Sequence, residues 1–288
     1  MHFVGLDLAW AEGNQTGVAV LDGDGRLVQV GTAVSDDEIA AAVAPYVDGP
    51  CVVAIDAPLI VRNPTGYRLG ETLYNRDFAP FEATAQPANT GNPLFDPPRA
   101  EVLCERLYLD TDPQSRADRR AIEVYPHAAT IALFKLGKTL KYKRRAKDVV
   151  KRKDELLKMV ELIEGLNDAN PRLRVRSSPA WLELRKRIEA GARAFQLNAC
   201  EDPVDAVLCA YVALFFDRRR EDVTIYGDRE DGYIVTPALP PGLTPAPRGR
   251  SVSPPGPGDV LPRLEQVQLL IERAQRELTE IRRQLGGY

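Results

Sequence analysis

The stretch Cys51-Val-Val-Ala-Ile-Asp-Ala-Pro58 decides the fold expected for this chain of 288 residues. Residues 51–55 form an unbroken apolar run, which is typical of a strand covered on both faces of a sheet. The chain then reaches a carboxylate, Asp56, and a proline two residues later, which favours the end of the strand. We therefore expect a buried central strand that ends in an acidic side chain.

The residues before this strand predict the beginning of an α/β domain. Asp22-Gly-Asp-Gly25 is a strong hairpin signal. Ser35 can cap a helix over residues 35–47, with Glu38 at capping-box spacing. The apolar or alternating segments expected as strands are residues 3–8, 16–21 and 27–34. The pattern predicts three meandering strands, a helix and then the central strand, which together form a mixed sheet flanked by helices.

Residues 57–98 break this regularity. Seven prolines and three glycines punctuate them, and no helical or strand period is sustained. A long irregular stretch inside a compact domain is usually functional or disordered, so we expect an insertion that acts as a lid or contacts substrate. Beyond it we expect helices at 99–109, 128–136, 146–165 and 179–195, a helix that opens at Asp202, and strands at 121–125, 223–226 and 233–235.

The C-terminal part differs in composition from the rest. Residues 237–262 are rich in Pro, Gly, Ser and Thr, which predicts an extended linker after a domain of residues 1–236. Residues 263–288 carry apolar side chains at heptad spacing, which predicts a coiled-coil helix and a homo-oligomer. These positions are Leu264, Val267, Ile271, Ala274, Leu278, Ile281 and Leu285. The alternative is that this helix folds back onto its own domain.

Composition limits the class of protein. The net charge of −3 carries no global nucleic-acid signature, so any such signal must be local. The N-terminus enters a strand directly and no apolar run approaches about 20 residues, so we expect a cytoplasmic protein without a membrane span. The four cysteines show no Cys-x-x-Cys spacing and are expected to be free, buried thiols.

Three carboxylates stand where strands are expected to end. Asp7 and Asp56 follow apolar strands, and Glu123 precedes Pro126. A carboxylate beside apolar surface is costly unless it is paired or binds a cation. Carboxylates gathered from separate strand ends suit hard cations such as Mg²⁺ or Mn²⁺. The alternative is structural: an aspartate that accepts backbone N–H groups of the next turn, and a solvent-facing Glu123.

Two further acids occur in Glu201-Asp-Pro-Val-Asp205. Asp202 followed by Pro203 is a common helix start, in which Asp205 would lie in the first turn. No charge follows Asp205 until Asp217, so its side chain is expected to point inward. We therefore predict that Asp205, more than Asp202, serves as a metal ligand.

The local basic segment is residues 135–153. It holds ten Lys or Arg residues against Asp148 alone, a net charge of +9. We expect Lys141, Lys143 and Arg152 to contact phosphates and Tyr142 to stack on a base. A solvated helix face is the alternative.

The motifs Gly5-Leu-Asp-Leu-Ala-Trp10, Ile55-Asp-Ala-Pro-Leu59, Glu123-Val-Tyr-Pro126 and Glu201-Asp-Pro-Val-Asp-Ala206 resemble, in this order, those of the domain of unknown function 429 family. That family is described as predicted RNase H-like nucleases. The resemblance implies an RNase H-like α/β fold in which carboxylates of the first strand, the fourth strand and the last helix hold two divalent ions. The spacing of Asp202 and Asp205 is similar to that of paired aspartates in Holliday-junction resolvases of the same superfamily.

The resulting hypothesis is a metal-dependent nuclease that hydrolyses phosphodiester bonds of DNA or RNA. Asp7, Asp56, Glu123 and Asp205 would be catalytic, and Asp202 would complete the metal shell. One rival is an ATP-dependent phosphotransferase of the actin-like superfold, but Leu8-Ala9-Trp10 stands where that class needs a Gly- or Thr-rich phosphate turn. The other is a catalytically silent scaffold. Metal titration separates the three, because only the nuclease should bind Mg²⁺ or Mn²⁺ without nucleotide.

Overall fold

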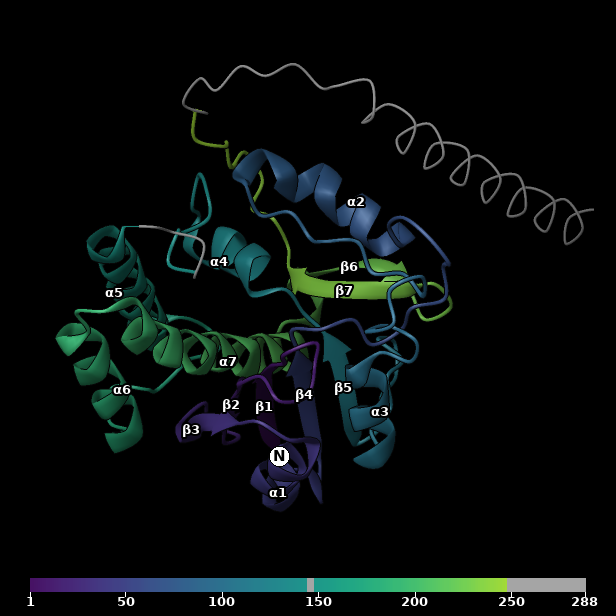
Figure 1. The fold of residues 1–288 in the computed structure, drawn as a ribbon, viewed down its shortest axis with the longest axis horizontal. Coiled ribbons are helices and arrows are strands. Elements are labelled where there is room, and N and C mark those ends of the chain that lie inside the picture. Colours follow the sequence, from purple (N-terminus) through teal and green to yellow (C-terminus); the bar gives the residue numbers. More distant parts are fainter. Residues whose placement is uncertain (144–147, 248–288) are drawn as a thin grey trace, which may run out of the picture.

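A computed structural model describes residues 1–143 and 148–247 and places a five-stranded mixed sheet at the centre (Figure 1). The strand order is β3-β2-β1-β4-β5. The strands are β1 (His2–Asp7), β2 (Thr16–Leu21), β3 (Leu27–Ala33), β4 (Cys51–Ile55) and β5 (Arg119–Glu123). The first three form an antiparallel meander, and β4 and β5 run parallel to β1. The predicted mixed sheet flanked by helices is confirmed.

Strand β4 is buried along its whole length, as its apolar run predicts. Helix α1 (Asp36–Val47) follows β3 and begins with the predicted capping box, in which Glu38 N–H donates to Ser35 Oγ at 3.1 Å. Helix α7 (Ala194–Arg218) is the longest helix described and packs on β1, β2 and β4 (Figure 1). Sixteen of its residues are buried, so it forms the main helical layer of the core.

The prediction that a helix opens at Asp202 is wrong. Helix α7 begins eight residues earlier, at Ala194, and Gln196 closes its first turn by accepting the Arg193 N–H at 2.9 Å. Pro203 therefore lies inside the helix. Burial of the whole apolar face against the sheet outweighs the hydrogen bond that Pro203 cannot donate.

The segment predicted to be irregular, residues 57–98, contains helix α2 (Leu69–Phe78) and a 3₁₀ turn (Ala79–Phe81). Helix α2 packs on a second, two-stranded sheet of β6 (Val223–Asp228) and β7 (Gly232–Pro237) (Figure 1). Tyr74 and Phe78 stack at 4.8 Å between ring centroids inside this contact. The prediction that residues 57–98 are irregular is therefore wrong for α2, which forms because its aromatic side chains have a second sheet to pack on.

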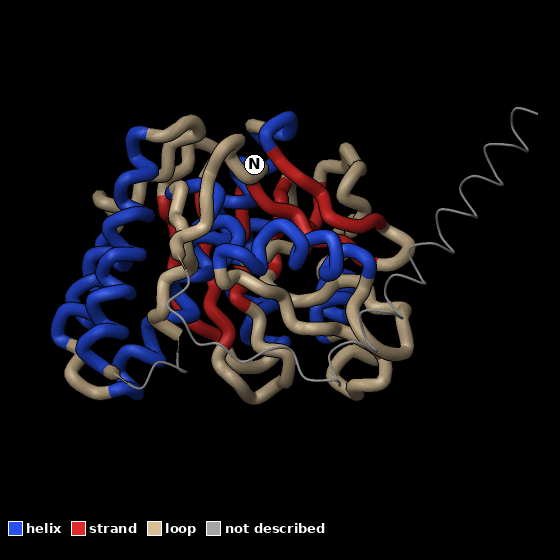
Figure 2. The backbone as a smooth tube through the Cα atoms, turned by 90° about the horizontal axis from the view of Figure 1, so that it is seen from above, coloured by secondary structure: helices blue, strands red, loops and turns tan. Residues whose placement is uncertain are grey.

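The remaining described helices are α3 (Arg99–Arg106), α4 (Pro126–Phe134), α5 (Val149–Gly165) and α6 (Pro179–Ala190). Helices α5, α6 and α7 contact one another, and Figure 2 shows helices grouped at one end of the molecule, beside the strands. No described helix is long and apolar enough to cross a membrane. The four cysteines are free and buried, as predicted.

The predicted linker and heptad helix fall mostly outside the described residues. Within the described part, Leu239 and Leu243 pack against the cluster that contains Tyr74 and Phe78. The first residues of the predicted linker therefore belong to the packed body. The heptad positions, on which the prediction of an oligomer rests, lie beyond residue 247 and so outside the described residues.

Candidate functional site

Two glycines allow α7 to approach the sheet closely. A Cβ built on Gly5 would collide with the backbone of Ala206 and Ala210, and one on Gly17 would collide with the backbone of Asp202. Side chains two residues apart on a strand share one face. Asp7 therefore faces α7, as Gly5 does. The close approach brings Asp205, one turn along the helix from Asp202, beside the end of β1.

The ammonium group of Lys143 joins Asp7 and Asp205. Lys143 Nζ lies 3.2 Å from Asp7 Oδ2 and also forms an ion pair with Asp205 Oδ2. Asp205 is fully buried, and its Oδ1 accepts a hydrogen bond of 2.6 Å from the hydroxyl of Tyr142. Burial alone would lower the pKa of Lys143, but the charges of Asp205 and Asp7 outweigh burial and raise it well above the usual value. Lys143 is therefore charged and neutralises part of a buried acidic pair.

Asp56 is the third carboxylate of this cluster. It follows β4, and its backbone N–H donates to Leu6 O at 2.8 Å, which holds the turn beside the end of β1. Burial first and the charge of Asp7 second raise the pKa of Asp56 well above its usual value, while Lys143 acts in the opposite direction. Burial likewise raises the pKa of Asp7, opposed by Lys143 and assisted by Asp205. The charges of the three carboxylates therefore act on one another, and Lys143 supplies one positive charge among them.

Glu123 does not belong to this cluster. In the parallel register Leu6 pairs with Ile55 and Ile55 pairs with Glu123, so these three side chains share one face of the sheet. Asp7 comes one residue later in β1 and faces the other side of the sheet, whereas Asp56 lies beyond the end of β4 and lines a small recess together with Glu123. Sequence spacing placed Glu123 at a strand end correctly, but the pleat directs it away from Asp7.

On its own face Glu123 is held by a buried arginine. Arg68 donates from Nη1 to Glu123 Oε2 at 2.9 Å and from Nη2 to Oε1 at 2.5 Å, and the Leu59 N–H donates to Oε2 at 2.9 Å. Arg68 also binds Glu71, through Nε at 2.9 Å. A carboxylate with this set of donors is already neutralised. The predicted catalytic and metal-binding role of Glu123 does not fit these contacts.

Asp202 makes a different contact from Asp205. Its Oδ2 accepts a hydrogen bond of 2.8 Å from Gln15 Nε2, which ties α7 to the loop between β1 and β2. Its carbonyl oxygen lies against Gly17. The sequence ranked Asp205 above Asp202 as the inward-pointing acid, and the burial of Asp205 agrees with that order.

The predicted phosphate contacts separate into two kinds. Lys141 is exposed and pairs with Glu82 at 2.7 Å. Arg152 is only 2% exposed and is paired with Glu201, so it does not fit a role in phosphate binding. It also donates from Nε to Tyr142 O at 2.7 Å, which fixes the Lys143 segment to the helices.

Tyr142 is fully buried, so the prediction that it stacks on a base is wrong. Arg144, Arg145 and Lys147 lie outside the described residues.

The donor set of the cluster fits a hard divalent cation, since carboxylate oxygens are the ligands that Mg²⁺ and Mn²⁺ prefer. Within residues 1–143 and 148–247, however, no group of three or more His, Cys, Asp or Glu side chains is arranged to hold a metal ion. The ammonium of Lys143 lies between two of the three carboxylates and carries the positive charge there. Asp7, Asp56 and Asp205 are thus the residues that would hold a cation if Lys143 moved aside.

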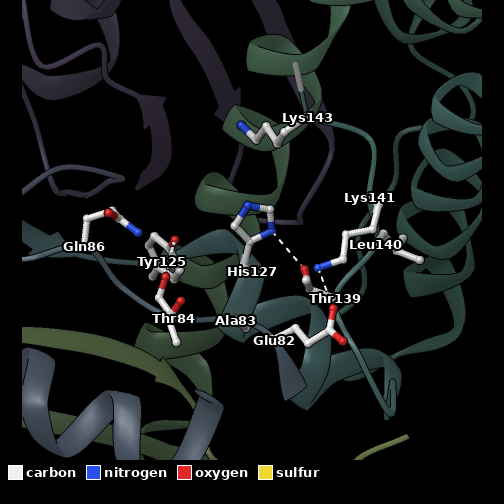
Figure 3. Close-up of a pocket in the computed structure, with 10 residues that line it drawn as sticks. All are labelled: Glu82, Ala83, Thr84, Gln86, Tyr125, His127, Thr139, Leu140, Lys141 and Lys143. Atoms are coloured by element: carbon white, nitrogen blue, oxygen red, sulfur yellow. Dashed lines mark hydrogen bonds and ion pairs between the residues drawn. The ribbon is translucent and has the colours of Figure 1, made fainter. Parts of the chain in front are cut away.

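A cavity of about 430 Å³ adjoins the cluster (Figure 3). Lys143 lines its edge, and His127 lies among the lining side chains, where its Nδ1 is 3.1 Å from Thr139 Oγ1. Burial and the charges of Lys143 and Lys141 lower the pKa of His127 to about 3, so its ring is neutral at physiological pH. Tyr125 forms a second aromatic side of the cavity, and its hydroxyl donates to Thr84 O at 3.0 Å.

Sequence reasoning did not identify Arg68, Glu71 or His127 as part of this region. Arg68 and Glu123 are 55 residues apart, and nothing in the pattern of residues 57–98 marks them as partners. The charge run did mark Lys143, but as a phosphate contact. Its position between Asp7 and Asp205 depends on residues 136 and 62 positions away along the chain.

The comparison with protein families agrees with the motifs. The family model described as "Protein of unknown function (DUF429)" matches residues 5–231. This span includes Asp7, Asp56, Lys143 and Asp205, and it ends at the residue before β7 begins. No curated protein and no solved structure gives a significant match to the chain. The match covers most of the chain, and the protein therefore belongs to the DUF429 family.

Proposed function

We propose that the protein is a divalent-metal-dependent nuclease with an RNase H-like fold, whose active site is formed by Asp7, Asp56 and Asp205. The observation that carries this proposal is the cluster itself. Three carboxylates from β1, the end of β4 and α7 converge beside apolar core, and Lys143 contributes one positive charge to them. Like charges held this close are costly unless cations compensate them.

The sheet topology supports the fold part of the proposal. An antiparallel meander of β1 to β3 continues into parallel β4 and β5 with β1 in the middle, and α7 crosses β1 and β4. Carboxylates at the end of the first strand, after the fourth strand and on the last long helix occupy the positions that the RNase H-like resemblance implies. In this proposal Glu123 and Arg68 have a structural role: Glu123 accepts the Leu59 N–H and Arg68 donates to Ile60 O, which stabilises the segment that follows Asp56.

The residues suggest a division of work. Asp7, Asp56 and Asp205 would hold Mg²⁺ or Mn²⁺, which supplies activation of water and charge stabilisation at the leaving oxygen of a phosphodiester. Tyr142 orients Asp205 through the hydrogen bond to its Oδ1. Lys143, released from Asp7 and Asp205 when a metal takes its place, would be free to contact a phosphate oxygen beside the site.

Metal binding tests the proposal before any substrate is known. Mn²⁺ should raise the melting temperature of the full chain by mass action, and Asp7→Asn and Asp205→Asn should each abolish the rise. Asp154→Asn, an exposed acid on α5, is the matched control and should respond like the wild type. Nuclease assays on single- and double-stranded DNA and RNA with Mn²⁺ then assign the activity. If both site variants still respond to Mn²⁺ as the wild type does, the metal binds elsewhere and the proposed site is refuted. No response of the wild type would favour the scaffold alternative.

A further inference from the structure

The cavity beside Lys143 has the size and lining of a small-ligand site. Its volume of about 430 Å³ lies within the range of about 300–1,000 Å³ in which proteins bind small molecules. It is lined by the segment after α2, the turn into α4 and residues 139–143 (Figure 3). Because Lys143 contacts both the cavity and the acids Asp7 and Asp205, a ligand here would reach the carboxylate cluster.

One side of the cavity suits a flat heterocycle. The rings of Tyr125 and His127 both line it, with centroids 5.6 Å apart and planes at 68°. The neutral ring of His127 presents no charge that a nucleobase would have to desolvate. Thr84 and Gln86 also line the cavity and are exposed, so they can exchange water for the polar edge of a base.

The other side suits an anion. Lys141 and Lys143 both line it, and Glu82 is the one acidic side chain in the lining. Lys143 is paired with Asp7 and Asp205 here, and under the proposed function it would be released to an anion when a metal takes its place. The pair between Lys141 and Glu82 is exposed, so it contributes little stability and can open to admit a phosphate. The aromatic and cationic groups together match the two ends of a nucleotide.

A third aromatic side chain, Trp10, lies in a neighbouring recess. Trp10 is 40% exposed and lines a small recess of about 40 Å³ together with Asp56, Gln86 and Tyr125. Gln86 and Tyr125 also line the larger cavity, so the two spaces are neighbours across these side chains. Aromatic rings hold single strands by stacking on their unpaired bases.

From this arrangement we propose that the cavity binds one unpaired nucleotide of the substrate, with its base against Tyr125 and His127 and its phosphate at Lys141 and Lys143. The inference rests on the proposed nuclease function and adds a substrate class: single-stranded or unpaired nucleic acid, rather than an intact duplex. A base that is paired and stacked in a duplex cannot enter a cavity of this size without leaving the stack.

Calorimetric titration of the full chain tests the site, with AMP, UMP and inorganic phosphate as probes and with or without Mn²⁺. Both nucleotides should bind at least about tenfold more tightly than phosphate, because base stacking adds to the phosphate contact. Tyr125→Leu should remove that difference and leave phosphate binding unchanged. Lys141→Ala should weaken all three probes, whereas Lys158→Ala on exposed α5 removes the same charge and should change none. Gln86→Ala, at an exposed position, repeats the test of the base contact if Tyr125→Leu does not fold.

The outcomes separate this proposal from the nuclease proposal. Equal affinity for nucleotide and phosphate in the wild type, or unchanged nucleotide binding in both Tyr125→Leu and Gln86→Ala, overturns the nucleotide site even if Mn²⁺ stabilises the protein. Nucleotide binding that depends on Tyr125, without any response to Mn²⁺, retains the nucleotide site and refutes the nuclease. A fluorescent single strand that binds no better than its duplex would contradict the substrate class.

Discussion

Gly5 of β1 lies directly against Ala206 of α7, so closely that a Cβ on Gly5 would collide with the Ala206 carbonyl oxygen. This contact sets the distance between the strand that carries Asp7 and the helix that carries Asp205. The acidic site therefore depends on a glycine two residues before its first aspartate. The span matched by the family model, residues 5–231, includes both positions.

Gly5→Ala should destabilise the protein by about 1–3 kcal/mol or more, because the helix and strand backbones must separate to admit a methyl group. The separation should also weaken the response to Mn²⁺. Chemical denaturation and metal titration measure the two effects. Gly31→Ala in β3 is the control, since a Cβ there meets nothing within 4 Å and the change should stay within about 0.5 kcal/mol. Equal stability of the two variants would show that α7 is not held by this contact.

Glu123→Gln should lower the free energy of unfolding by about 3–5 kcal/mol, because it leaves the buried guanidinium of Arg68 short of one carboxylate. Urea denaturation at neutral pH measures the loss. Glu221→Gln, which removes an exposed partner of Arg219, should cost at most about 1 kcal/mol. The folded fraction of Glu123→Gln should still respond to Mn²⁺. If Glu123→Gln lost the response to Mn²⁺ while its free energy of unfolding stayed unchanged, Glu123 would be a metal ligand after all.

Lys143→Gln should destabilise the metal-free protein by up to about 3 kcal/mol, the lower end for breaking a buried pair, because a third of the Lys143 side chain is exposed. Asp7 and Asp205 then repel each other without a counter-charge. Mn²⁺ should therefore raise the melting temperature of this variant more than that of the wild type. The exposed Lys158→Gln should match the wild type in both measurements. A smaller metal response in Lys143→Gln would mean that the lysine assists metal binding instead of competing with it.

His127 should make the protein less stable in acid. Its pKa is lowered to about 3 in the folded state, against a usual value of 6.5, so unfolding takes up a proton below pH 6.5. The stabilisation is complete above pH 6.5 and is lost as the pH falls towards 3. His127→Gln should flatten the pH dependence of the free energy of unfolding between pH 6.5 and 4, measured by urea titrations at several pH values. Parallel curves for variant and wild type would show that folding does not lower the pKa of His127.

The local sequence pattern was sufficient to predict the elements whose own residues specify their conformation. The apolar run at 51–55 predicted β4, and Asp22-Gly-Asp-Gly25 predicted the hairpin of β2 and β3. Prediction from local pattern failed where packing against a segment distant in sequence determined the secondary structure. Helix α2 forms because β6 and β7, about 150 residues later in the chain, give its aromatic face a surface to pack on. Helix α7 continues past Pro203 because the sheet covers it on both sides of that residue.

The sequence by itself determined which carboxylates stand at strand ends, because strand termination is a local event that a run of apolar residues and a following turn specify. It also determined the family, since the motifs follow one another along the chain. Only the tertiary structure decided which of these acids meet. Pleat alternation turned Glu123 towards Arg68, the glycine contact brought Asp205 to Asp7, and the long-range packing of Arg152 directed Lys143 between them. The physical reason is that side-chain direction and approach between elements depend on register and packing, which no single segment encodes.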